Sequence, residues 1–195
     1  MSGESAAIGI RVRTGRAIAV LVAGTKQKPR LLERRDVQLH DPAVPHSGQP
    51  HHVALEIGEE AAAPLVKRAL ECVRKLGRRE VERLCDSVDK SGHSLRGVGL
   101  VVGSLGDPEK LGNPHVRAHA REGQLYWQVL DSAAKALGVP CSVTTEKDIW
   151  DDAVESLRMD PDALRKALTE LGRTVGRPWS AYEKTATLAA WSKLK

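Results

Sequence analysis

The chain lacks phenylalanine, and its aromatic side chains are limited to four tryptophans and two tyrosines among 195 residues. Alanine, valine and leucine must therefore supply most of a core. No apolar stretch approaches the ~20 residues of a membrane-spanning helix, so no membrane partner is expected. The first residues, MSGESAAIGI, contain no basic segment followed by an apolar one, so a secretory signal is not expected either.

Cysteine is scarce as well. Cys72, Cys85 and Cys141 are odd in number and widely separated, which fits neither a disulfide framework nor a Cys-x-x-Cys metal site. Unpaired thiols are typical of proteins in a reducing compartment. We therefore expect a cytoplasmic protein with three free cysteines.

The charge balance is basic but modest. Lys and Arg number 30 against 25 Asp and Glu, for a formal net charge of +5. This excess fits a polyanion partner such as DNA or RNA, although it is too small to establish one. The length, with 41% hydrophobic residues, is that of a single globular domain over residues 1–195. A homodimer stays an open alternative.

Apolar periodicity predicts an α/β protein. Three strands joined by short turns form an antiparallel meander, and two βα units follow. Asn113-Pro114 is a helix start and Gly138 a helix stop. The expected strands are 8–13, 16–24, 31–39, 97–103 and 141–145. The expected helices are 55–76 (kinked or split at Pro64 and stopped at Gly77), 79–88, 114–137, 148–158 and, within a C-terminal appendage of about 161–195, 161–171 and 180–194.

This order of elements, with right-handed crossovers, places helices on both faces of one mixed five-stranded sheet. It resembles the ribonuclease H-like fold, and within it the branch of Holliday-junction resolvases and small pre-ribosomal-RNA resolvases. The resemblance covers roughly residues 8–157 and depends on topology and short glycine-bracketed runs rather than on a catalytic signature. It implies carboxylates at strand ends that hold Mg²⁺ or Mn²⁺ and cut phosphodiesters.

The first of those carboxylates is missing. In the resembled family the opening strand carries an aspartate within a Gly-Ile-Asp sequence, and the matching stretch here is Gly9-Ile10-Arg11. A guanidinium repels a cation instead of binding it. We therefore favour a catalytically degenerate member of the fold.

Later carboxylates keep a second hypothesis open, an active metal-dependent nuclease that uses Mg or Mn. Asp107 and Glu109 follow the fourth expected strand, Glu146 and Asp148 follow the fifth, and Asp151 lies one helical turn further. The alternative is structural, because acidic side chains in a first helical turn cap the helix and complement its dipole.

His115 and His119 lie four residues apart near a helix start, and Glu122 falls on the same face. Two histidines at this spacing with a carboxylate are a known zinc arrangement, so the three residues are candidate metal ligands. The glutamate of an HExxH motif is missing, however, and no third ligand is evident. A helix start that faces solvent or phosphate is the alternative.

Arginines give a candidate surface for DNA or RNA. Arg11, Arg13 and Arg16 should emerge on one side of the first strand and its turn, and Arg117 lies near the start of a helix. Such a face would attract phosphates without cutting them, with salt-sensitive affinity, unless it is simply solvated surface. A third hypothesis is a protein-interaction module or an actin-like nucleotide-binding protein, since actin-like proteins share this sheet order and fold alone does not decide function.

Overall fold

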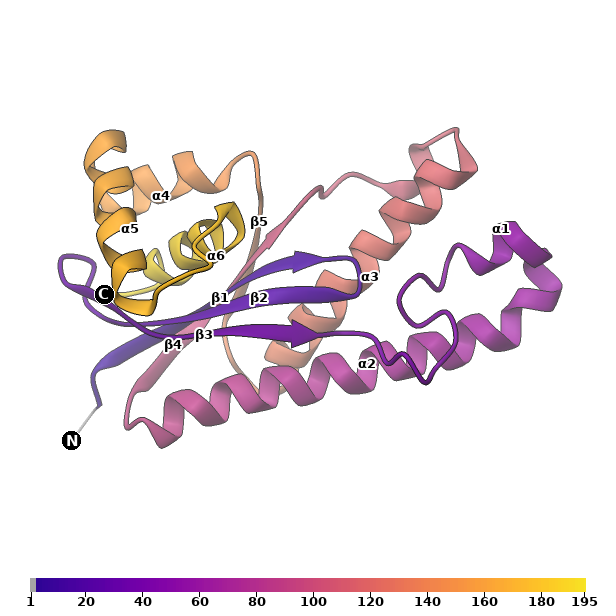
Figure 1. The fold of residues 1–195 in the computed structure, drawn as a ribbon, viewed down its shortest axis with the longest axis horizontal. Coiled ribbons are helices and arrows are strands. Elements are labelled where there is room, and N and C mark those ends of the chain that lie inside the picture. The colour runs from indigo at the N-terminus through magenta and orange to yellow at the C-terminus, as the bar shows by residue number, and fades with distance from the viewer. Residues whose placement is uncertain (1–2) are drawn as a thin grey trace.

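A computed structural model describes residues 3–195 and places a mixed five-stranded sheet between two layers of helices (Figure 1). The strands are β1 (Ser5–Arg13), β2 (Arg16–Gly24), β3 (Pro29–Gln38), β4 (Ser94–Val102) and β5 (Cys141–Thr145). Their order in the sheet is β3-β2-β1-β4-β5. β2 runs antiparallel to both of its neighbours, whereas β1, β4 and β5 are parallel. The predicted α/β class and topology are confirmed.

Helices cover both faces of this sheet. They are α1 (Val53–Ile57), α2 (Glu59–Lys90), α3 (Pro114–Ala136), α4 (Ile149–Leu157), α5 (Pro161–Val175) and α6 (Ala181–Trp191), with a short 3₁₀ turn η1 (Pro108–Lys110). α2 and α3 lie against one face, and α4, α5 and α6 lie on the other (Figure 1). Within residues 3–195, no helix combines the length and the apolar character needed to cross a membrane.

The alternation along β1 divides the core between the two faces. Ile8 and Ile10 pack into a cluster with Leu130 of α3, whereas Ala7 belongs to a second cluster with Leu188 of α6. All five side chains are buried. The odd-numbered residues of β1, including the arginines at its end, therefore share the α6 face.

The predicted break at Gly77 is wrong. α2 is one helix of 32 residues, and the chain breaks earlier, at Gly58, whose φ is 85°. Gly77 serves the packing of α2 against α3, because a Cβ there would lie 2.3 Å from Cγ1 of Val129. Pro64 lies near the start of α2 and does not split the helix. Gly77 thus marks a close contact between two helices and not the end of a helix.

The C-terminal segment is not an appendage. α6 lies directly on the sheet, where a Cβ at Gly9 would meet the Ala186 carbonyl oxygen at 1.8 Å. Trp191 is 2% exposed, and its indole Nε1 donates to the Lys26 carbonyl at 2.9 Å. Glycine in β1 allows the helix backbone to approach the strand, so α6 completes the second core cluster.

All three cysteines are free, as predicted, and each is partly buried. Burial raises the pKa of the Cys85 thiol to about 11 and that of Cys141 to about 12, and it raises the pKa of Cys72 as well.

Because the thiolate is the nucleophile, we expect iodoacetamide at neutral pH to label Cys72 first, with Cys85 and Cys141 at least about tenfold slower. Peptide mass spectrometry over a time course measures this order, and fastest labelling at Cys141 would contradict it.

Candidate functional site at the strand ends

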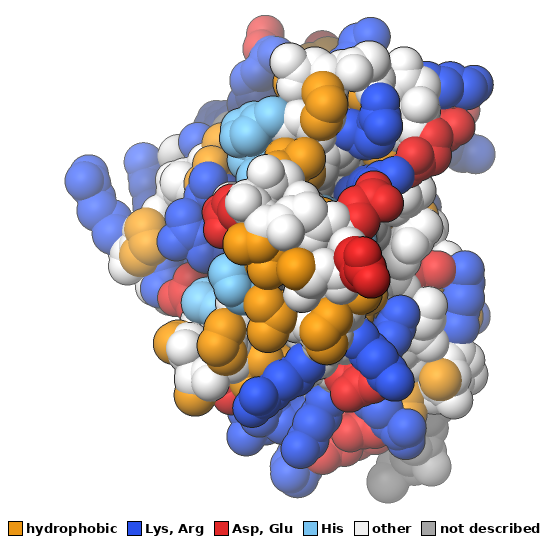
Figure 2. Space-filling model, turned by 90° about the vertical axis from the view of Figure 1, so that its right-hand side faces the viewer, with side chains coloured by type: hydrophobic (Ala, Val, Ile, Leu, Met, Phe, Trp, Pro, Cys, Tyr) orange, Lys and Arg blue, Asp and Glu red, His pale blue; other side chains and the backbone are white. Residues whose placement is uncertain are grey.

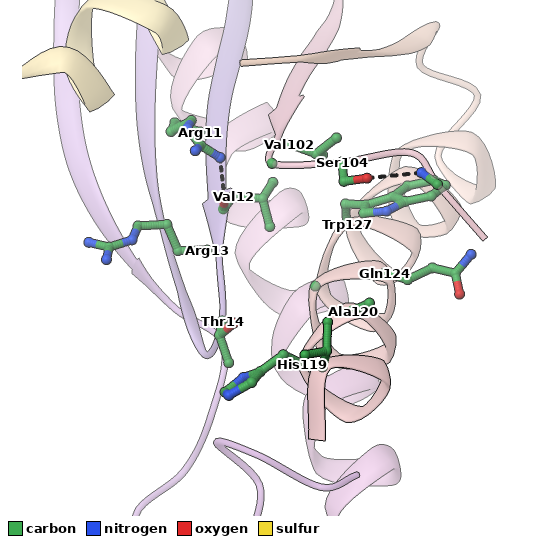
Figure 3. A pocket seen from close by; sticks show the side chains of 14 residues that line it. Arg11, Val12, Arg13, Thr14, Val102, Ser104, His119, Ala120, Gln124 and Trp127 are labelled. Carbon is green, nitrogen blue, oxygen red and sulfur yellow. Dashed lines mark hydrogen bonds between the residues drawn. The ribbon is translucent and has the colours of Figure 1, made fainter. Parts of the chain in front are cut away.

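The carboxyl ends of β1 and β4 border a pocket of about 440 Å³ whose opposite wall is α3. Arg11 and Arg13 line it from β1, Ser104 from the loop after β4, and Gln124 and Trp127 from α3 (Figure 3). The parallel register of β1, β4 and β5 brings three strand ends to this one edge. It is the edge at which the sequence placed the expected carboxylates.

Arg11 occupies the centre of this edge and is only 6% exposed. Its guanidinium forms an ion pair with Glu146, which follows β5, and donates to the Val12 carbonyl at 2.7 Å (Figure 3) and the Val101 carbonyl at 3.4 Å. Arg11 and Glu146, one of the predicted acids, therefore neutralise each other's charge. Because its charge is buried and paired, Arg11 is not the exposed phosphate contact that the sequence predicted.

The other candidate acids have local structural partners. Asp107 caps η1 by accepting from the Glu109 amide at 3.0 Å. Glu109 forms two hydrogen bonds of 2.7 Å with Arg121, and this guanidinium lowers the pKa of the Glu109 carboxyl. Asp148 accepts from the Thr145 hydroxyl at the start of α4.

These acids do not gather into a metal site. Asp151 is exposed in the first turn of α4, where it complements the helix dipole. Across residues 3–195, histidines provide the single group of three or more His, Cys, Asp or Glu donors that could hold one ion. Asp107 therefore caps η1, whereas Asp148 and Asp151 occupy the N-cap position and the first turn of α4, and the Asp148 side chain makes no capping hydrogen bond.

Arg13 and Arg16 lie at the same edge, where Arg13 is partly buried and Arg16 is exposed. They face each other across the β1–β2 ladder, and neither has a carboxylate partner among residues 3–195. The Arg13 guanidinium lies over the Tyr182 ring of α6, 4.5 Å from its centroid. Arg117 is held differently, because its Nε donates to the Leu111 carbonyl at 2.9 Å.

The three predicted metal-ligand candidates lie together, but in different roles. His115 and His119 converge with His52, a residue that the sequence analysis missed because it comes from a distant loop. Glu122 is fully buried and pairs with Nδ1 of His52 at 2.7 Å, so it supports a histidine. Burial raises the pKa of the Glu122 carboxyl, and desolvation lowers that of His119. The His51-His52 pair was the one available sequence signal.

No family model matches the chain, and no curated protein matches it significantly. The structure of Thermus thermophilus RuvC in complex with a Holliday junction substrate superposes with a TM-score of 0.54 at 14% identity, over 97% of this chain and 92% of that chain. A second Thermus thermophilus RuvC structure gives 0.49 at 12% identity, over 96% and 92%. A Ppx/GppA family member from Aquifex aeolicus gives 0.39 at 11% identity, over 80% and 40%.

The first of these superpositions establishes the class of the protein: it has a ribonuclease H-like α/β fold. The particular fold that it resembles over nearly its whole length is that of RuvC. This match extends past residue 157, where the predicted resemblance ended. At 14% identity the likeness concerns the fold alone.

Proposed function

We propose that this protein binds DNA or RNA along the strand-end edge and does not cut it. The observation that carries the proposal is the Arg11–Glu146 ion pair at the carboxyl end of β1. In the resembled family this is the place of the opening aspartate. A buried guanidinium there already pairs with Glu146, the one acid among residues 3–195 that forms an ion pair with it.

Electrostatics argue against a divalent ion beside Arg11. A dication at about 4 Å from an unpaired guanidinium would be repelled by roughly 8 kcal/mol at an effective dielectric constant of about 20, and Glu146 can offset part of this repulsion only while it stays paired with Arg11. Two-metal phosphodiester cleavage needs several anionic ligands in a small space. Asp107 lies at η1, and Asp148 and Asp151 lie at the start of α4, with local partners or solvent around them.

Arg13 and Arg16 supply the attraction for a nucleic-acid backbone. Like charges directly opposite each other on antiparallel strands are unfavourable, and a phosphate between them removes that repulsion. Tyr182 holds the Arg13 guanidinium from one side. Contacts of this kind hold a backbone without reading its bases, so the affinity should depend strongly on salt.

The test is fluorescence anisotropy with labelled four-way junction, duplex and single-stranded DNA and RNA at several salt concentrations. The double variant Arg13→Glu/Arg16→Glu should bind at least about tenfold more weakly, and the slope of log affinity against log salt should fall by about 2. No cleavage is expected when Mg²⁺ or Mn²⁺ is added.

A charge-matched control is Lys28→Glu/Lys166→Glu, two exposed residues on the β2–β3 turn and on α5. It changes the net charge equally and should retain the affinity within about threefold. Equal losses in both double variants, or no nucleic-acid binding by the unmodified chain at low salt, would contradict the proposal. Mn²⁺-dependent cleavage that disappears in Asp148→Asn would replace it with the nuclease hypothesis, and thermal stabilisation by ATP would favour the actin-like one.

A further inference from the structure

Three imidazoles converge next to the strand-end pocket. His52 lies at the start of α1, and His115 and His119 lie in the first turns of α3. The distances between ring centroids are 4.2 Å for His52–His119, 4.6 Å for His115–His119 and 4.9 Å for His52–His115. One nitrogen of each ring lies within 4.8 Å of the others.

A buried carboxylate fixes one of these rings. Glu122, which is fully buried, lies 2.7 Å from Nδ1 of His52. Nε2 is therefore the nitrogen of His52 that is free to act as a ligand. It is buried and has no hydrogen-bond partner within the described chain. A buried polar atom left without a partner costs about 1–3 kcal/mol, and coordination would remove this cost.

The loop that carries His52 is held against α3. Tyr126 of α3 is fully buried, and its hydroxyl donates to the carbonyls of Ser47 at 2.6 Å and Gly48 at 2.9 Å. This anchor lies one helical turn beyond Glu122 on the same helix. The Glu122 carboxylate and the Tyr126 hydroxyl of α3 thus hold the loop before α1 in place, which reduces the conformational entropy lost when a metal ion binds.

We propose that His52, His115 and His119 bind one Zn²⁺ ion, with Glu122 as the hydrogen-bonded support of His52. Neutral imidazoles suit Zn²⁺ and related transition ions, whereas Mg²⁺ and Ca²⁺ prefer oxygen ligands. With Zn–N bonds of about 2.0–2.1 Å, a tetrahedral site needs nitrogen pairs about 3.4 Å apart, which small side-chain rotations can achieve here. Three protein ligands leave the fourth position to water.

The site opens onto the surface at the rim of the pocket. His115 and His119 are exposed, and the face that contains the start of α3 carries histidine side chains among hydrophobic ones (Figure 2). His119 also lines the pocket, beside Thr14 (Figure 3). An ion can therefore enter from solvent at the rim of the pocket, on the α3 face of the sheet, whereas the Arg13 side chain points to the α6 face (Figure 3). The metal proposal nevertheless stands on other residues than the nucleic-acid proposal, and either can fail alone.

The test uses the full chain without a histidine tag, stripped of metal with a chelator. Calorimetric titration with Zn²⁺ should give one equivalent, and titration with Co²⁺ should give the strong visible absorption of a four-coordinate ion. The double variant His115→Gln/His119→Gln should weaken Zn²⁺ binding at least about 100-fold. Both residues are exposed, so the variant should fold.

Two further variants sharpen the result. Glu122→Gln keeps the size of the side chain and should weaken binding about 10–100-fold, as expected of a carboxylate that orients a histidine ligand. His93→Gln, which changes a histidine that pairs with Glu4, should leave binding unchanged. The proposal is overturned if the chain binds no Zn²⁺, if the double variant binds as tightly as the unmodified chain, or if Co²⁺ gives only the weak spectrum of a six-coordinate ion.

Discussion

Gly9→Ala should destabilise the fold by at least about 3 kcal/mol, a large share of the 5–15 kcal/mol that separates most folded domains from their unfolded chains. The added Cβ would lie 1.8 Å from the Ala186 carbonyl oxygen and 2.8 Å from the Ala190 nitrogen. Both are backbone atoms of α6, so no side-chain rotation relieves the overlap. α6 would have to move off the sheet, and urea unfolding followed by circular dichroism measures the loss.

Gly123→Ala is the matched control. Gly123 lies within α3, and a Cβ there meets no atom within 4 Å. Because glycine inside a helix loses more backbone entropy on folding than alanine does, this change should stabilise the protein by about 0.5–1 kcal/mol. A Gly9→Ala variant as stable as the unmodified chain would mean that α6 does not cover β1 as described.

Glu146→Gln should cost more stability than Arg11→Met, although both changes break the same ion pair. The Arg11 side chain is 7% exposed and that of Glu146 is 45% exposed. Removing the acid leaves a buried guanidinium without a counter-charge, a loss of about 3–5 kcal/mol in comparable pairs. Removing the arginine leaves a carboxylate that water can reach, and we expect a loss of only about 1–2 kcal/mol from the hydrogen bonds to Val12 and Val101.

Urea unfolding of both variants and of the double variant Arg11→Met/Glu146→Gln measures the asymmetry. The double variant should be more stable than Glu146→Gln alone, because no unpaired buried charge remains. Asp151→Asn, an exposed acid of the following helix, should change the free energy of unfolding by less than about 0.5 kcal/mol. If Arg11→Met were the more damaging change, the burial of the guanidinium would not be the dominant energetic term.

Local signals predicted the elements well where a short motif sets the boundary. α3 begins after Asn113, whose side chain accepts from the amides of His115 and Val116, and it ends before Gly138, whose φ is 70°. The predicted strand 141–145 matches β5 to the residue. Gly77 was misread because a glycine that stops a helix and a glycine that admits a neighbouring helix look alike until the neighbour is known.

The sequence likewise predicted some features of the candidate site and missed others. The sequence Gly9-Ile10-Arg11 predicted the position of Arg11 near the end of the opening strand. The burial of Arg11 and its pairing with Glu146 depend on the parallel pairing of three strands, which the local sequence does not specify. Spacing placed His115 and His119 on one helical face. Spacing could not predict that His52 joins them, because His52 lies far from α3 in the sequence and meets that helix only in the folded protein.

The sequence by itself determined the α/β order, the antiparallel meander and the arginine near the end of the first strand, since periodicity, caps and turns act over a few residues. Only the tertiary structure decided which charges are buried, which acids have local partners and which histidines meet. Those outcomes depend on contacts between segments far apart in the chain, where the burial of one group is set by another that no local pattern specifies.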